Sequence, residues 1–544
     1  MSTRFDHVTR LDGVSLALFQ GWFTAVAEEM GATLMRSAHS PNITERLDHS
    51  CAVFDANARL VAQAAHIPVH LGSMPRAVEA ALALAPFAPG DVVLLNDPFA
   101  GGTHLPDLTC VSPVFLAGRR MPDFFVASRA HHADVGGAAP GSLPLAREVY
   151  EEGFRIPPVR LMRAGRPVPE VMALLLANVR TPEERRADLQ AQLGAQRTGE
   201  RRLHELARRD RSPRLVGAAQ ALLDATERRT RAAIRKLPSG LWSFHDVLDG
   251  DGLVDEPVRI ALTLTLGRGR ALFDWTDSAQ QTRGPVNAVR AVVTAASMYA
   301  LRCVLGDDIA VNDGLLRCVE VLTRPGSVLD PLPPAAVGAG NVETSQRLVD
   351  VAFGALAKAL PARMPAASSG TMNNLLIGGV DPRTGRPFAY YETLGGGHGA
   401  GPDAPGESAM QTHMTNTRNT PIESLEHAYP LHVVRTRIRR GSGGAGRRRG
   451  GEGIERVIEM RADARVTVIA ERRRRGPWGL AGGADGQPGV TRVRWHQTDR
   501  REQTLPAKFT FDLPKGAVLT VASPGGGAHG AALPRASRSR RKRS

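Results

Sequence analysis

Histidine and aspartate residues gather in two glycine- and proline-rich stretches early in the chain. His104 and Asp107 lie in NDPFAGGTHLPDLT, and His131 opens the later stretch HHADVGG. Imidazole and carboxylate groups are the usual protein ligands of a divalent metal that activates water. Pro106 disfavours a helix interior, and a straight strand would send positions 104 and 107 to opposite faces. We therefore expect a turn from which His104, Asp107 and His131 converge on one metal ion.

Three further polar residues accompany this set and are candidates for catalytic roles. His132 and Asp134 follow His131, and we expect them to support the ligands, because a ligating imidazole usually donates its other N–H to a carboxylate or carbonyl. Glu152 could be a general acid or base, could orient the ligands, or could form a surface ion pair. The alternative for the whole set is a purely structural role, because His and Asp side chains also form hydrogen bonds with backbone groups in tight turns.

Polar residues also stand beside glycines in the second half of the chain. They are Asn341, Glu343, Gln346, Glu392 and His398. Loops of this kind often approach a ligand closely, but a role in stabilising turns explains these polar residues about as well. The block at 413–426 is rich in threonine, asparagine and arginine. It could bind substrate or hold a subunit interface.

Short apolar segments must position these groups. Residues 91–95 predict a buried strand that leads into the first glycine-rich loop, and residues 124–127 predict a second strand that leads to His131. CAVFDANARLVAQA predicts a hairpin that turns at residues 55–57. Residues 14–37 have the apolar spacing of an amphipathic helix. Loops at the ends of rigid strands are a common place for reactive groups.

The length of 544 residues exceeds a single hydrophobic core, so we predict a mixed α+β protein of several subdomains. Apolar alternation at 258–266 indicates a strand, and helices are expected near 287–304 and 346–360. We divide the chain into a metal-site α/β region (1–180), a charged helical segment (181–245), a central α/β region (246–430), a β-rich C-terminal region (431–533) and a basic, disordered tail (534–544).

Composition argues against several classes of function. The formal charge of +15 is carried almost entirely by arginine, with only five lysines, which is more typical of a GC-rich genome than of a phosphate-binding face. Without a recognition motif, we predict no specific nucleic-acid binding. No apolar run is long enough to span a membrane and the N-terminal residues lack a signal-peptide core, so we expect a cytoplasmic protein without membrane attachment. The four cysteines are scattered and are expected to be reduced, mostly buried thiols.

Several catalytic motifs are missing from the sequence. There is no GxxxxGK[ST] phosphate-binding loop, no GxSxG nucleophile elbow and no HExxH zinc motif. If ATP is consumed in the reaction, another polypeptide must therefore bind it.

The blocks NDPFAGGTHLPDLT, AHHADVGGAAPGS and EEGFRIPP resemble the hydantoinase B/oxoprolinase family, and further matching blocks run from about residue 35 to about residue 530. This family supplies the B subunit of ATP-dependent lactamases and hydantoinases and is related to the alpha subunit of acetone carboxylase. The resemblance implies that His104, Asp107 and His131 hold the metal. It also places Asp48, from the ERLDxS motif, in the active site. His49 follows where the family often has an aromatic residue, and could alter the substrate pocket or lie at the surface.

The resemblance also implies a reaction and a partner. A separate A subunit of the actin-like ATPase type would phosphorylate a lactam or hydantoin. This chain would then open the activated ring with one divalent zinc, manganese or iron ion. Asp48, His132, Asp134 and Glu152 are the candidate catalytic groups, and the two subunits would form a hetero-oligomer. The nearest alternative is an acetone carboxylase-like alpha subunit that carboxylates an activated enolate. A scaffold that binds nucleic acid or an acidic partner is a more distant one.

Overall fold

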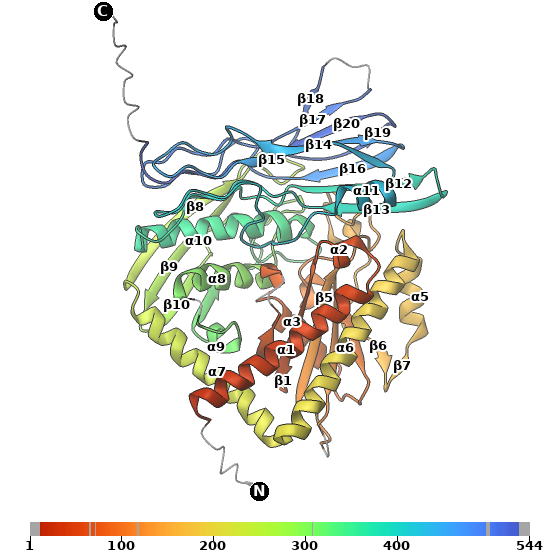
Figure 1. The fold of residues 1–544 in the computed structure, drawn as a ribbon, viewed down its shortest axis with the longest axis vertical. Coiled ribbons are helices and arrows are strands. Elements are labelled where there is room, and N and C mark those ends of the chain that lie inside the picture. Colours follow the sequence, from red (N-terminus) through yellow and green to blue (C-terminus); the bar gives the residue numbers. More distant parts are fainter. Residues whose placement is uncertain are drawn as a thin grey trace, which may run out of the picture.

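A computed structural model of the protein describes residues 11–64, 67–70, 72–116, 119–306, 308–496 and 501–532. Helices and four β-sheets are mixed along the described chain, which confirms the α+β class (Figure 1). The expected basic tail at 534–544 lies outside the described residues.

The first sheet is antiparallel throughout and carries the strands around the predicted metal site. Its strands, in spatial order, are β2 (Leu60–Gln63), β1 (His49–Asp55), β5 (Phe124–His131), β4 (Asp107–Val114), β3 (Val92–Leu95), β6 (Val159–Arg163) and β7 (Arg166–Pro167). Every residue of β1, β4 and β5 is buried. Both faces of these central strands are covered, and polar side chains such as Thr109 and Arg129 are buried among the apolar ones.

Helices cover each face of this sheet. On one face lie α1 (Gly13–Ser37) and α6 (Pro182–Asp210), which run side by side across the strands (Figure 1). The apolar stripe of α1, including Phe19, Phe23 and Met30, packs against Phe124 of β5. Helix α3 (Met74–Leu82) covers the opposite face. Helix α6, in the segment predicted to be charged and helical (181–245), packs directly on β4 and β5.

The second sheet packs against two buried helices. Its order is β11 (Val319–Leu322), β10 (Arg270–Asp274), β9 (Val258–Gly267) and β8 (Gly240–Leu248). Helix α10 (Ser345–Ala359) lies against β8 and β9, and α8 (Arg290–Leu305) packs beside α10. Helix α7 (Ser212–Arg235) connects the first sheet to this one.

The C-terminal part is built from two stacked sheets around one core, at the top of Figure 1. One sheet has the order β13 (Arg386–Glu392), β12 (Asn374–Asp381), β16 (Ala464–Ile469) and β19 (Lys508–Leu513). The other has the order β14 (Leu431–Arg439), β15 (Gly453–Met460), β20 (Val518–Ala522), β17 (Val490–Arg494) and β18 (Gln503–Leu505).

The remaining helical segments are short. They are α2 (Pro41–Thr44), η1 (Pro68–His70), η2 (Pro98–Ala100), α4 (Val149–Glu152), α5 (Pro169–Ala177), α9 (Asp313–Leu316), η3 (Gly340–Thr344) and α11 (Ile422–Ala428).

Most predicted elements are confirmed. The hairpin around residues 55–57 is β1 and β2, the strands at 91–95 and 124–127 are β3 and the first half of β5, and the helix at 14–37 is α1. The strand at 258–266 and the two later helices correspond to β9, α8 and α10. None of the four cysteines forms a disulfide, and of the four only Cys303 is exposed.

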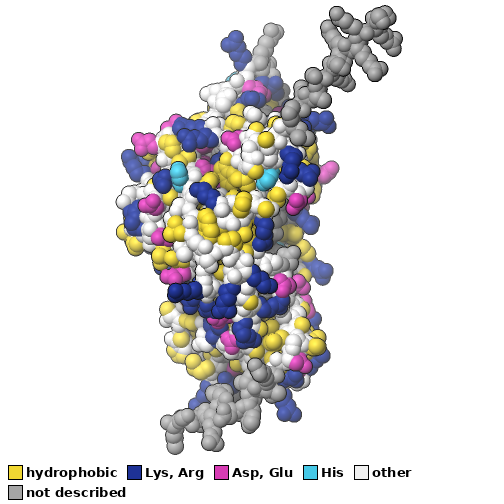
Figure 2. Space-filling model, turned by 90° about the vertical axis from the view of Figure 1, so that its left-hand side faces the viewer, with side chains coloured by type: hydrophobic (Ala, Val, Ile, Leu, Met, Phe, Trp, Pro, Cys, Tyr) yellow, Lys and Arg dark blue, Asp and Glu magenta, His cyan; other side chains and the backbone are white. Residues whose placement is uncertain are grey.

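Charge is distributed rather than gathered on the face shown in Figure 2. Basic side chains there are interspersed with acidic ones, and hydrophobic side chains collect near the middle of the view. Along the described ranges, no helix is both long and apolar enough to cross a membrane.

Candidate metal centre

The central strands of the first sheet bring three candidate residues to one edge. Asp107 begins β4 and lies directly opposite His131, the last residue of β5. The backbone N–H of His131 donates to the carbonyl of Asp48, just before β1, at 3.0 Å. His104 lies one turn before Asp107, and the N–H of Asp107 donates to its carbonyl at 3.2 Å. The turn predicted for the HLPD segment is therefore present.

The side chains of His104, Asp107 and His131 converge. Asp107 Oδ1 lies 3.0 Å from His104 Nε2 and 3.3 Å from His131 Nδ1. All three residues are at most 2% exposed. Their nitrogen and oxygen atoms form a cluster with the spacing of a metal site, as predicted.

The hydrogen bonding of His104 shows why this cluster requires a positive charge. His104 Nδ1 lies 3.3 Å from the carbonyl oxygen of Gly338, to which it can donate. In the neutral ring, Nε2 would then direct a lone pair at the Asp107 carboxylate. Burial alone would lower the pKa of His104, but the Asp107 carboxylate outweighs it and the pKa is raised. Burial would likewise raise the pKa of Asp107, but His104 outweighs it and holds that pKa well below its ordinary value.

An unsatisfied ring nitrogen supports the same interpretation. His131 Nε2 is buried and has no hydrogen-bond partner, whereas His104 Nε2 lies 3.0 Å from the Asp107 carboxylate. A buried polar atom without a partner is costly, and a cation held by this set of donors would remove that cost. Imidazole and carboxylate donors suit zinc, manganese or iron equally well, so the residues fit the expected class of metal.

Aromatic and cationic side chains close the cavity from the other side. The Tyr391 ring of β13 stacks on His131, with ring centroids 4.7 Å apart and planes at 25°. The guanidinium of Arg46 also lies over the Tyr391 ring, 4.4 Å from its centroid. The cavity is lined by Asp48, His70, Asn341, Met372, Thr393 and Met414, among others. Its volume of about 20 Å³ has room for an ion or a water molecule and is too small for a ring substrate.

Asp48 is the one candidate catalytic residue that lines this cavity together with the three expected ligands. Its carboxylate lies 4.0 Å from the buried guanidinium of Arg46. His49 is buried, so the surface alternative for that residue is wrong.

The contacts of His132 and Asp134 do not support the roles we expected for them. His132 Nε2 lies 3.0 Å from Gln192 Oε1 of α6, and burial lowers the pKa of His132 to about 4. Asp134 accepts from the backbone of Gly136 and Gly141 and pairs with Arg180 at 2.9 Å. His132 therefore ties the sheet to α6 and Asp134 closes a loop, and neither contacts the three expected ligands.

Glu152 reaches the cluster indirectly. Its Oε1 accepts from the backbone N–H groups of Val337 and Gly338, at 2.8 and 2.7 Å. The carbonyl of Gly338 in turn faces His104 Nδ1. Glu152 is 1% exposed, which excludes a surface ion pair, and burial raises its pKa to about 8. Of the roles considered, orientation of a ligand has the most structural support.

The later polar residues are divided between the cavity and structural contacts. Asn341 lines the cavity, and its Nδ2 lies 3.5 Å from Asp107 Oδ2. Glu343 accepts from the amide of Asn374, and Glu392 pairs with Arg456 at 2.8 Å.

His70 is a cavity residue that we did not select from the sequence. Its Nε2 lies 3.4 Å from Asp107 Oδ2. The motif HIPVHLGS has no recognised ligand spacing, so only the fold reveals this contact.

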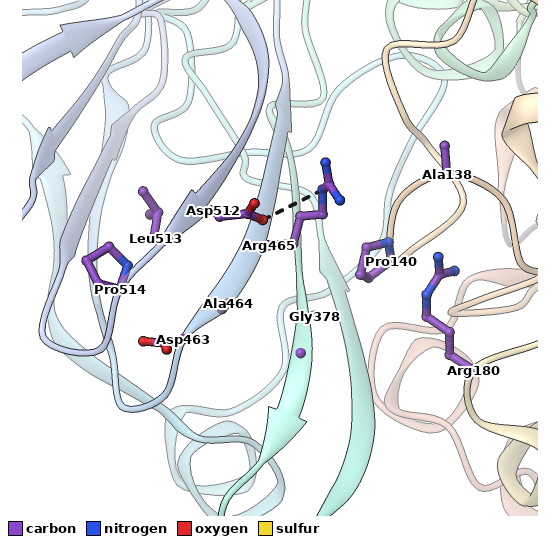
Figure 3. A pocket seen from close by; sticks show the side chains of 11 residues that line it. Ala138, Pro140, Arg180, Gly378, Asp463, Ala464, Arg465, Asp512, Leu513 and Pro514 are labelled. Carbon is purple, nitrogen blue, oxygen red and sulfur yellow. Dashed lines mark ion pairs between the residues drawn. The ribbon is translucent and has the colours of Figure 1, made fainter.

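A larger pocket of about 600 Å³ lies elsewhere, between the loop at 138–140 and the β16–β19 edge. Arg180 and Arg465 approach it from either side of Pro140, and Arg465 pairs with Asp512 (Figure 3). None of the three expected metal ligands lines it.

Comparisons with known proteins agree with the sequence blocks. The sequence model of the hydantoinase B/oxoprolinase family matches residues 12–532. 5-oxoprolinase 1 of Arabidopsis thaliana is 38% identical over 95% of this chain, which spans only 42% of that longer protein. A protein of Pseudomonas sp. (strain NS671), provisionally named as the B subunit of a D-/L-hydantoinase, is 29% identical, with 98% of this chain and 93% of that protein covered. The crystal structure of an ATP-dependent caprolactamase from Pseudomonas jessenii matches with a TM-score of 0.89 and 29% identity, over 96% of this chain and 91% of that chain.

Proposed function

The chain belongs to the hydantoinase B/oxoprolinase family, and on that premise we propose that it is the ring-opening B subunit of an ATP-dependent lactamase or hydantoinase. The observation that carries the proposal is the convergence of His104, Asp107 and His131 in a buried cavity, where His131 Nε2 has no hydrogen-bond partner. The chain spans 93% of the hydantoinase relative and 42% and 40% of the 5-oxoprolinases of Arabidopsis thaliana and Dictyostelium discoideum.

In the proposed reaction, a partner ATPase subunit transfers the terminal phosphoryl group of ATP to the carbonyl oxygen of a cyclic amide. Water then adds to that carbon, and the C–N bond breaks as the ring nitrogen takes up protons, which leaves an acyl phosphate. A second water displaces phosphate from this acyl phosphate and gives the free carboxylate. A divalent metal held by His104, Asp107 and His131 would supply Lewis-acid chemistry by lowering the pKa of water.

The residues of the chain have separate roles in this proposal. Asp48 lines the cavity and is the carboxylate that can accept the proton of the attacking water. Glu152 holds the 337–338 backbone, and through the carbonyl of Gly338 it fixes the ring of His104. Tyr391 and Arg46 cover the cavity and limit access of water from the side of β13.

The direct test is elemental analysis together with a coupled assay. Wild-type chain should contain about one transition-metal ion per chain, which His104→Ala and His131→Ala should lose. Reconstituted with a family ATPase subunit, wild type should open a lactam or hydantoin ring with hydrolysis of ATP, and both variants should fail. His204→Ala is a matched control, because His204 lies on the partly exposed side of α6 beside Glu200. Turnover retained by His104→Ala would refute the assignment.

Substrate and reaction type are read from the same assay. A panel of 5-oxoproline, hydantoin and caprolactam identifies the ring that is opened. Incorporation of labelled bicarbonate without ring opening would instead indicate the carboxylase alternative. The proposed location is the cytoplasm, where ATP is available to the partner subunit.

A further inference from the structure

His70 is a buried histidine that contacts the proposed metal centre but has no role in the reaction described above. It ends the short helix η1 and is 2% exposed. One ring nitrogen, Nε2, lies 3.4 Å from Asp107 Oδ2, and the other, Nδ1, lies 2.9 Å from Ser50 Oγ.

The Asp107 carboxylate and the Ser50 hydroxyl together favour one tautomer of His70. Ser50 Oγ accepts a hydrogen bond from the backbone N–H of Ile67 at 3.4 Å. The Asp107 carboxylate can only accept, so the ring nitrogen that faces it, Nε2, carries the proton, and in the neutral ring Nδ1 accepts the hydroxyl proton of Ser50. In the neutral ring the proton is on Nε2, and this N–H faces the Asp107 carboxylate.

The two oxygens of Asp107 consequently have different environments. Oδ2 faces three donors, since Thr103 Oγ1 donates at 2.8 Å and Asn341 Nδ2 at 3.5 Å in addition to His70. Oδ1 faces the nitrogens of His104 and His131. Oδ2 of Asp107 is thus occupied by hydrogen-bond donors, and Oδ1 is directed towards the place where a cation would lie.

The segment that carries His70 is held on both sides. Ser73 Oγ accepts from Arg129 Nη1 at 2.6 Å and donates to the carbonyl of Val69 at 3.1 Å. A Cβ added at Gly72 would come within 2.9 Å of the backbone of Ala295 in α8, so this turn packs directly on that helix. The His70 ring therefore has little freedom to move away from Asp107.

We propose that His70, oriented by Ser50, is a positioning residue that keeps Asp107 directed at a bound divalent cation through Oδ1 alone. The inference rests on the proposed metal centre and adds to it a control over coordination. Without the His70 donor, the carboxylate can rotate and offer both oxygens, which changes the coordination geometry and weakens the site.

The test uses the full-length chain, stripped of metal and titrated with Co²⁺, whose visible absorption reports coordination geometry. His70→Ala should bind Co²⁺ about 10–100-fold more weakly and should show an altered spectrum. His70→Gln should recover most of the affinity and the wild-type spectrum, because its amide N–H can donate to Asp107 Oδ2. Ser50→Ala should fall between wild type and His70→Ala. His529→Gln is the matched control, since His529 is also buried but lies beyond β20, outside this cluster.

Three results would overturn the inference. The first is wild-type affinity and spectrum in His70→Ala. The second is equal weakness of His70→Gln and His70→Ala when both are folded, which would mean that ring volume matters and the donor does not. If His70→Ala does not fold, Ser50→Ala decides, and unchanged Co²⁺ binding there is the third. A chain that passes these tests but opens no ring with its ATPase partner would refute the proposed function and leave this inference intact.

Discussion

Replacement of Glu152 by glutamine offers a sharp test of the buried carboxyl behind the centre. Glu152 ends α4 and is 1% exposed, and its Oε1 accepts two backbone N–H groups of the 337–338 segment. Glutamine keeps the shape and the accepting oxygen but does not titrate. The variant therefore isolates the ionisation of this one group.

The direction and size of the change in stability with pH follow from the pKa of Glu152. Burial raises the pKa of Glu152 from an ordinary 4.5 to about 8 in the folded protein. The folded state then binds this proton more tightly than the unfolded state, so its stability falls as pH rises between those two values. For these two pKa values, the loss between pH 5 and pH 8 is about 3–4 kcal/mol. Glu152→Gln has no titrating group here and does not lose this stability. Its free energy of unfolding relative to that of wild type should therefore rise by the same amount from pH 5 to pH 8.

Equilibrium urea unfolding of both metal-free proteins at pH 5 and pH 8 measures this difference. All other titrating groups cancel, because they are common to the two proteins. The cost of burying the glutamine NH₂ group beside no acceptor also cancels, since it does not depend on pH. If the difference between the two proteins is the same at both pH values, Glu152 ionises normally and the argument from burial is wrong.

Three further predictions address packing, buried charge and the cavity. The ring of Phe124 is fully buried and packs on Phe23. Phe124→Ala should therefore destabilise the protein by about 3–5 kcal/mol and lower the thermal midpoint in calorimetry. An unchanged midpoint would contradict the assigned core. Arg472 bridges the carboxylates of partly buried Asp246 and buried Asp350 at 2.7 Å each, so Arg472→Ala should cost about 3–5 kcal/mol in urea unfolding. A loss below 1 kcal/mol would speak against the bridge. Asp48→Asn should weaken metal binding about 10–100-fold in a chelator competition while leaving the stability of the metal-free protein unchanged; equal affinities would remove Asp48 from the centre.

The convergence of His104, Asp107 and His131 could be predicted because it depends on local features. A proline-containing turn and the ends of two buried strands bring these residues together, and both features are visible in the sequence. The direction of His132 could also have been predicted. Neighbours along extended backbone point to opposite faces, so a residue next to His131 at the end of β5 faces α6 instead of the cavity.

The contacts of His70 and Glu152 could not be read from the sequence in the same way. The contacts of the His70 ring are made with Ser50 of β1 and with Asp107 of β4. These residues are distant in the sequence and come close to His70 only in the folded sheet. Glu152 acts on backbone N–H groups, which any residue type at 337–338 other than proline would supply. Contacts of this kind leave no recognisable pattern of residue types in the sequence.

The pairing of β4 with β5 has a practical consequence for labelling the molecule. Asp107 and His131 pair at one end of this hairpin, and Val114 and Phe124 pair at the other, about 24 Å away along the strands. Met121, beside that far end, is 68% exposed. A fluorophore on Met121→Cys, with exposed Cys303 replaced by serine, would report assembly with a partner chain through energy transfer without disturbing the metal ligands.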